Sequence, residues 1–217
     1  ELMASSQPFP TRPAAFEYQG AERDDLIDFT PEIRRMAVDA VEGFRLGPLY
    51  TPLWLRGTVF RPSAGGGASW GGGAVDPETG MLYVPSRNAH SVMRFREPQP
   101  EDDATLRYLL SRGGAPFLDG GNPRRQPQMP EGLPLWKPPY SRMTAIDMNT
   151  GEHRWMVPTG DGDRIRNHPR LRHLDLPPLG GDAGRNGPVV TKTLLIYTLS
   201  AGATDGGPRL VAYDKTT

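Results

Sequence analysis

The chain contains no cysteine, so disulfide bonds and metal sites built on thiolates, such as zinc fingers and iron–sulfur clusters, are excluded. It also has no excess of either charge, because 25 Lys and Arg residues balance 25 Asp and Glu residues, for a formal net charge of +0. Such a chain exerts no long-range attraction on nucleic acid or on an anionic membrane surface. We therefore expect no nucleic-acid partner.

Long hydrophobic runs are missing too. The longest dense apolar stretch, TLLIYTL at 193–199, has the length of a strand and is far shorter than the about 20 residues of a membrane-spanning helix. The N-terminus has neither the basic nor the apolar region of a signal peptide. The sequence does not begin with Met, and its last residues end inside an expected turn. We therefore expect a piece of a longer protein, for which a missing signal says little about location.

Histidine is scarce, with four residues in the chain, and its spacing offers no catalytic or metal-binding arrangement. His168 and His173 lie five residues apart, which does not place them on one helical face, and no third ligand accompanies them. Their basic segment, 163–175, is offset by aspartates and lacks interleaved aromatic residues, which favours a solvated loop. The glycine run GGGASWGGG at 65–73 is not a phosphate loop, because no Gly-Lys-Ser/Thr follows it.

Glycine and proline are abundant instead, with 26 and 24 residues, whereas hydrophobic residues make up 36%. This composition favours a turn-rich chain over a helical bundle. Prolines at 8, 10 and 13 exclude a central strand or a helix interior near the N-terminus. We expect residues 1–29 to lie extended on another surface, anchored by Phe9 and Phe16.

One helix is predicted over residues 31–43, within an N-terminal extension that we assign to 1–57. Thr30 is a suitable N-cap, Pro31 suits the first helical position, and Gly43 suits the end. Apolar residues recur between them at helical spacing, which is typical of one buried face.

From residue 58 to 217 the pattern is that of strands. The turn sequence DPETG between two apolar runs predicts a β-hairpin over 70–85. Residues 87–141 are predicted to be an irregular insert, too long for an ordinary connection. A second group of strands is expected from residue 152.

Three segments resemble one another: AVDPETGMLYV (74–84), TAIDMNTGEHRWMVP (144–158) and LVAYDKTT (210–217). Their aspartates, Asp76, Asp147 and Asp214, are predicted to begin turns between strands and to be structural. In the second copy Trp155 ends the following strand and is expected to dock between sheets. The spacing exceeds the about 40–45 residues of a β-propeller blade and fits blades only with inserted loops. We predict an all-β chain of nearly two four-stranded blades; from the pattern alone a β-sandwich is the alternative.

These segments resemble the pyrroloquinoline-quinone-dependent (PQQ-dependent) dehydrogenases, the quinoprotein glucose and alcohol dehydrogenases. The resemblance is carried by the following stretches, and they cover nearly the whole chain: QPFPTRPAAF, DLIDFTPEIRRMAVDAVEGFRLGPLYTP, GGGASWGGGAVDPETGMLYVPS, MTAIDMNTGEHRWMVPTGDGDR and LPPLGGDAGRNGPVVTKTLLI. The first two are similar to the membrane-type glucose dehydrogenases.

The resemblance implies an eight-bladed β-propeller, of which this chain holds late blades, with PQQ bound beside Ca²⁺ near its axis. It implies oxidation of a sugar or alcohol with a catalytic Asp as base, and transfer of electrons to ubiquinone or a cytochrome. It also implies a periplasmic, membrane-associated setting. No motif of this chain matches the catalytic base or the Ca²⁺ ligands, which we expect outside it, so the chain alone is expected to be inactive.

The resemblance assigns four residues to cofactor binding: Trp70, Ser69, Asn186 and Gly187. A planar indole suits a planar cofactor, and flanking glycines let the backbone approach it. The family usually has Asn before this Trp, whereas Ser69 has a shorter reach. The alternatives are that Trp70 fills space between blades and that Asn186 caps a turn.

A function of another class stays open, namely a non-catalytic propeller that acts as a scaffold or binding protein. A scaffold has no need for glycine and tryptophan together near the axis, so the glycine run favours the enzyme.

Overall fold

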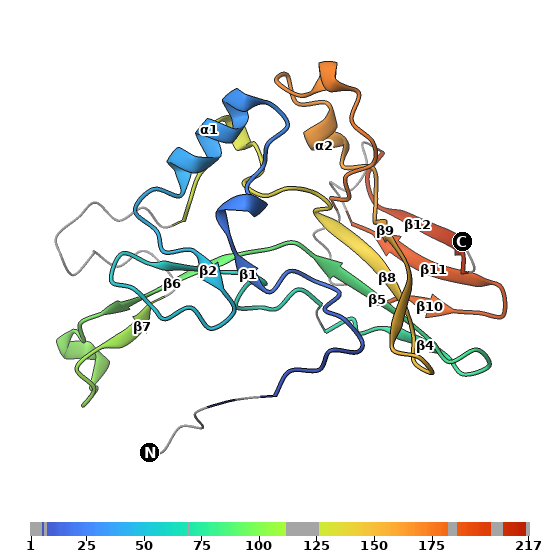
Figure 1. The fold of residues 1–217 in the computed structure, drawn as a ribbon, viewed down its shortest axis with the longest axis horizontal. Coiled ribbons are helices and arrows are strands. Elements are labelled where there is room, and N and C mark those ends of the chain that lie inside the picture. The colour runs from blue at the N-terminus through green and yellow to red at the C-terminus, as the bar shows by residue number, and fades with distance from the viewer. Residues whose placement is uncertain are drawn as a thin grey trace.

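The computed structural model describes residues 6, 8–68, 70–111, 126–181, 186–200 and 206–215. Antiparallel sheets dominate it, and the two α-helices lie on one side of them (Figure 1). The helices are α1 (Pro31–Ala40) and α2 (Asp163–Arg166), and the 3-10 turns are η1 (Arg23–Asp25), η2 (Pro100–Asp102), η3 (Pro130–Gly132) and η4 (Arg172–Leu174).

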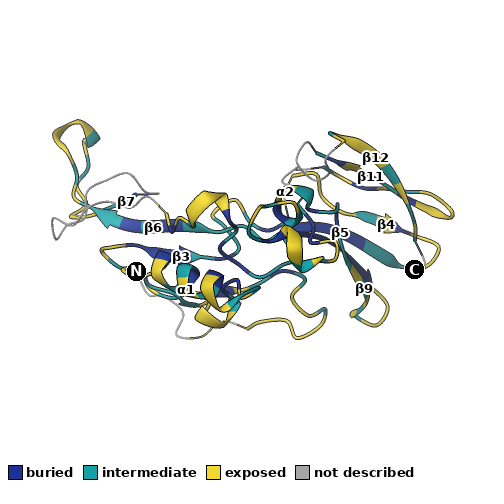
Figure 2. Ribbon diagram, turned by 90° about the horizontal axis from the view of Figure 1, so that it is seen from above, coloured by how far each residue is buried: buried dark blue, intermediate teal, exposed yellow. Residues whose placement is uncertain are grey.

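Two sheets stand next to each other towards the C-terminus (Figures 1 and 2). The first sheet has the order β4-β5-β8-β9: β4 (Ala74–Asp76), β5 (Met81–Arg87), β8 (Ser141–Asp147) and β9 (Glu152–Pro158). The second sheet has the order β10-β11-β12: β10 (Val189–Val190), β11 (Leu194–Leu199) and β12 (Arg209–Asp214). The predicted hairpin is therefore confirmed as β4 and β5. The second group of strands begins at β10 and not at residue 152, because β9 pairs with β8 and completes the first sheet.

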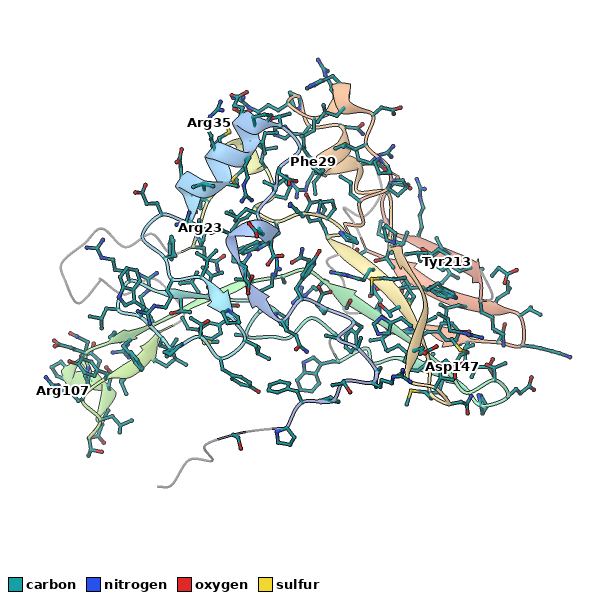
Figure 3. All side chains as sticks on the ribbon, in the orientation of Figure 1. Arg23, Phe29, Arg35, Arg107, Asp147 and Tyr213 are labelled. Atoms are coloured by element: carbon teal, nitrogen blue, oxygen red, sulfur yellow. The ribbon has the colours of Figure 1, made fainter. Side chains whose placement is uncertain are left out.

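Apolar side chains of both sheets fill the space between them (Figure 3). Tyr83, Met143 and Ala145 of the first sheet form one cluster with Leu195 and Tyr197 of the second. Strand β8 is buried along its whole length, on both faces. The sheets are thus packed face to face, as adjacent blades are.

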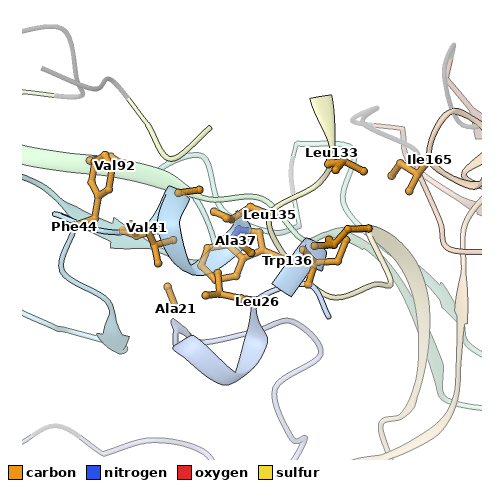
Figure 4. Close-up of a cluster of buried hydrophobic side chains, with 14 of the residues drawn as sticks. Ala21, Leu26, Ala37, Val41, Phe44, Val92, Leu133, Leu135, Trp136 and Ile165 are labelled. Carbon is orange, nitrogen blue, oxygen red and sulfur yellow. The ribbon is translucent and has the colours of Figure 1, made fainter. Parts of the chain in front are cut away.

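The N-terminal half contains two smaller sheets. They are β1 (Gly20–Ala21) with β2 (Gly47–Pro48), and β3 (Thr58–Phe60) with β6 (Ser91–Arg96) and β7 (Leu109–Ser111), in the order β3-β6-β7. Strands β6 and β7 belong to the segment that we expected to be irregular, so that expectation is wrong for them. Val92 of β6 and Leu135 and Trp136 further on are buried, because the segment supplies apolar side chains to the core around α1 (Figure 4).

Helix α1 begins as predicted, since the Thr30 hydroxyl oxygen accepts a hydrogen bond from the backbone N–H of Ile33 at 3.2 Å. It ends at Ala40, earlier than expected, and Gly43 takes a positive φ of 85° in the turn that follows. Its buried face, with Ile33, Ala37 and Ala40, packs on the core.

Candidate functional site

The glycine run 65–73 has an anchored first half. The carbonyl oxygen of Gly67 accepts a hydrogen bond from the backbone N–H of Arg87 in β5 at 3.0 Å. Gly66 has a positive φ of 77°, which favours glycine, and its N–H donates to the carbonyl of Ser63 at 2.7 Å. The first bond fastens the run to the end of β5, and the second closes a local turn.

The second half of the run is open. Trp70 is 93% exposed, which is unusual for so large an apolar side chain. Gly72 has a positive φ of 66°, and no atom lies within 4 Å of the position that a Cβ would take there. Trp70 therefore does not fill space between the two sheets of this chain. The exposed indole of Trp70 and the unobstructed backbone of Gly72 are thus neighbours just before β4.

The loop that leads into β10 meets the run at this point. A Cβ on Gly187 would collide with the carbonyl oxygen of Gly71, so the two backbones approach as closely as glycine allows. Asn186 donates a hydrogen bond from its side-chain amide to the carbonyl oxygen of Thr198 in β11 at 2.7 Å. The structure thus brings the predicted residues Gly187 and Asn186 close to the neighbour of Trp70, whereas Ser69 lies outside the described residues.

The opposite end of β4 is a closed, hydrogen-bonded turn. The carboxylate of Asp76 accepts bonds from the backbone N–H of Glu78 at 3.1 Å, the Thr79 hydroxyl at 2.7 Å and the Lys215 ammonium at 2.6 Å. The hydrogen bonds from Lys215 and Thr79 lower the pKa of Asp76 to about 2. Asp147 similarly accepts from the N–H of Asn149 at 2.9 Å. Both aspartates are turn residues, as the repeat predicted.

A cluster of buried charged side chains contacts the glycine run at Gly67, through Glu17. Glu17 and Arg142 of β8 form an ion pair of 2.6 Å with both side chains less than a tenth exposed. The guanidinium groups of Arg61 and Arg142 lie 4.0 and 4.7 Å from the ring centre of Tyr18, within reach of cation–π attraction. Arg61 also pairs with Asp25 at 2.6 Å, and burial lowers the pKa of Arg61 despite the opposing charge of Asp25.

No sequence pattern predicted this cluster. Of the two expected anchors of the N-terminal segment, Phe9 is half exposed and contacts Tyr50, with ring centres 5.7 Å apart, whereas Phe16 is partly buried. Glu17 and Tyr18 add buried contacts to the segment. No spacing or repeat marks them, because their partners lie more than 40 residues away in the sequence.

The site fits a flat aromatic ligand such as PQQ. The exposed Trp70 indole offers a stacking face, and the unobstructed backbone at Gly72 leaves room for a ring system beside it. Within the described part of the chain, no three His, Asp or Glu residues gather into a possible metal site. Nor does any helix there have the length and apolar character needed to cross a membrane.

Comparison with known proteins agrees with this geometry. Residues 1–217 match the family model described as "PQQ: Glucose/ethanol/alcohol dehydrogenase, beta-propeller domain". A relative, the quinate/shikimate dehydrogenase (quinone) of Acinetobacter baylyi, is 26% identical over 169 residues, which cover 74% of this chain and 21% of that protein. Adjacent open sheets and the full-length match to the family together show that the chain is part of a β-propeller and belongs to the PQQ-dependent quinoprotein dehydrogenases.

Proposed function

We propose that the complete protein carrying this chain oxidises the CH–OH group of an aldose or another alcohol with PQQ and passes the electrons to a quinone or a cytochrome. The observation that carries the proposal is the exposed Trp70 on a glycine run that meets Gly187. The name of the relative, a dehydrogenase of quinate and shikimate with quinone, adds cyclic hydroxy acids to the substrates worth testing and favours a quinone acceptor.

PQQ, when bound, supplies a two-electron oxidant that takes up the hydride of the substrate C–H bond while a base removes the hydroxyl proton. In this chain, Trp70 would stack on the cofactor and keep water from one of its faces. The backbone at Gly72 would approach the rim of the ring system, because no atom lies within 4 Å of the position that a Cβ would take there. Gly187 would hold the second sheet against that backbone.

We further propose that Ca²⁺ binds beside the cofactor, that a carboxylate acts as the base, and that the protein is periplasmic and associated with a membrane. The Ca²⁺ ligands and the base would lie outside this chain. The resemblance to membrane-type glucose dehydrogenases supports these proposals.

The test is dye reduction by the complete protein with glucose, simple alcohols and quinate, each with and without added PQQ and Ca²⁺. We expect oxidation that depends on PQQ, and in Trp70→Ala an affinity for PQQ at least about tenfold lower, since one aromatic stacking partner is lost. If the variant matches the wild type, Trp70 is not a cofactor contact. If no substrate is oxidised and PQQ does not bind, the protein is a non-catalytic propeller.

A further inference from the structure

The side chain of Glu17 packs against Gly67 of the glycine run. A Cβ built on Gly67 would stand 2.6 Å from Cγ of Glu17 and 3.3 Å from its Cβ, so the stem of Glu17 occupies the space that any larger residue at 67 would need. Gly67 is buried, and no positive φ explains the glycine there. The absence of a side chain at Gly67 is therefore explained by the contact with Glu17.

The carboxylate of Glu17 is itself held in place from two sides. Its Oε1 accepts a hydrogen bond from Arg142 of β8 at 2.6 Å and another from the backbone N–H of Tyr18 at 3.0 Å. Arg142 in turn lies against the ring of Tyr18. Removing one partner of a buried ion pair leaves the other charge buried and uncompensated, so the pair resists displacement of Glu17 from Arg142.

Three segments thus meet at Gly67. They are the N-terminal segment through Glu17, strand β8 through Arg142, and strand β5 through the N–H of Arg87. Gly67 precedes Trp70 by three positions in the sequence, so it is the nearest described residue before Trp70 that contacts the N-terminal segment. A shift of Glu17 would move Gly67 and, with it, the base of the open half of the run.

We infer that Glu17 is a positioning residue, which holds the glycine run through Gly67 and thereby sets the place of Trp70 for the cofactor. The inference rests on the proposed function in so far as Trp70 contacts PQQ. Glu17 does not touch the cofactor; it acts through the backbone of the run.

The experiment compares Glu17→Gln with Asp25→Asn in the complete protein. Both variants remove one carboxylate charge from the same buried cluster, since Arg61, the partner of Asp25, lies on the Tyr18 ring that Arg142 also contacts. Of the two carboxylate side chains, Glu17 is the one that lies among the atoms nearest to a Cβ at Gly67, which belong to Glu17 and Pro62. Asp25→Asn is therefore the control for loss of a carboxylate beside a buried arginine, although the Asp25 side chain is 28% exposed and that of Glu17 is 5% exposed.

The first measurement is amide hydrogen exchange in the cofactor-free protein. The N–H of Arg87, which donates to Gly67, reports whether the run is fastened. We expect its exchange to be about tenfold faster in Glu17→Gln than in the wild type and unchanged in Asp25→Asn. The second is PQQ affinity by fluorescence titration, which we expect to fall about tenfold in Glu17→Gln alone, because small displacements of a positioning contact have large effects.

Gly67→Ala tests the same contact from the glycine side, because the added methyl group would overlap the side chain of Glu17. Gly65→Ala is its control, because a Cβ at Gly65 meets its nearest atom at 3.7 Å. Equal effects of Glu17→Gln and Asp25→Asn on exchange and affinity would overturn the inference. Failure of the wild type to bind PQQ would overturn the proposed function, while the exchange rates would still decide whether Glu17 fastens the run.

Discussion

Two tryptophans of the first sheet have opposite surroundings. Trp70 precedes β4 and is 93% exposed, with glycine on its C-terminal side. Trp155 lies in β9, packs against Tyr83 with ring centres 5.7 Å apart, and is part of the apolar contact between the two sheets. One tryptophan is available to a ligand, and the other helps to join two blades.

The same contrast separates the two ends of β4. Towards Trp70, the indole is exposed and the space beside Gly72 is open, while the carbonyl oxygen of Gly71 lies against Gly187. Towards Asp76, every described oxygen contact of the carboxylate is made within the turn or to Lys215 of the next sheet. A strand of three residues therefore joins an end with an exposed aromatic side chain to an end closed by hydrogen bonds.

The largest effect on stability is expected from replacing Trp155, and not Trp70, by alanine. Trp155→Ala should lower the free energy of unfolding by about 2 kcal/mol, because it leaves Tyr83 without its aromatic partner. Trp70→Ala should change it by no more than about 0.5 kcal/mol, because an exposed side chain contributes little to folding. Denaturant unfolding of the complete protein measures both.

PQQ titration of the same two variants should give the reverse order. Affinity falls in Trp70→Ala and is kept in Trp155→Ala, once the latter is measured where it is folded. Comparable losses of stability in both variants would break the comparison, since Trp70 would then be a packing residue.

The next largest effect on stability is expected at the contact between Gly187 and Gly71. Gly187→Ala should destabilise the protein by about 1–3 kcal/mol, because its methyl group would overlap the carbonyl oxygen of Gly71. Gly65→Ala, in the same glycine run but with its nearest atom at 3.7 Å and no positive φ, should stabilise the protein by about 0.5 kcal/mol, because alanine lowers the conformational entropy of the unfolded chain. Thermal unfolding of both distinguishes a glycine required for close approach from one that is not.

The sequence alone predicted those features of the fold that depend on neighbouring residues. The Asp-initiated turns, the hairpin around Gly80 and the N-cap at Thr30 depend on residues within four positions of one another, and all three are confirmed. The docking of Trp155 between sheets followed from its place in the repeat.

What the sequence could not provide are contacts between distant segments. The ion pair of Glu17 with Arg142 spans 125 positions, and that of Asp76 with Lys215 spans 139. The strands within residues 87–141 were missed for the same reason, because β6 pairs with the distant β3. Its buried residues are Val92 and Arg94, so the apolar residues of β6 do not mark its buried face. The cofactor role of Trp70, Asn186 and Gly187 remains a prediction, although the structure shows Asn186 bonded to Thr198.

The smallest effect is the pH dependence of the closed end. The pKa of Asp76 is about 2 in the folded protein and 3.8 in an unperturbed carboxyl, so its hydrogen bonds stabilise the fold above pH 4 and are lost as the pH falls towards 2. Asp76→Asn should therefore lower the melting temperature near pH 6, and the difference from the wild type should shrink steadily between pH 4 and pH 2. Substrate oxidation at neutral pH should be retained, because Asp76 lies at the opposite end of β4 from Trp70. A variant that melts like the wild type at pH 6 but oxidises nothing would reverse the assignment and place the chemistry at the closed end.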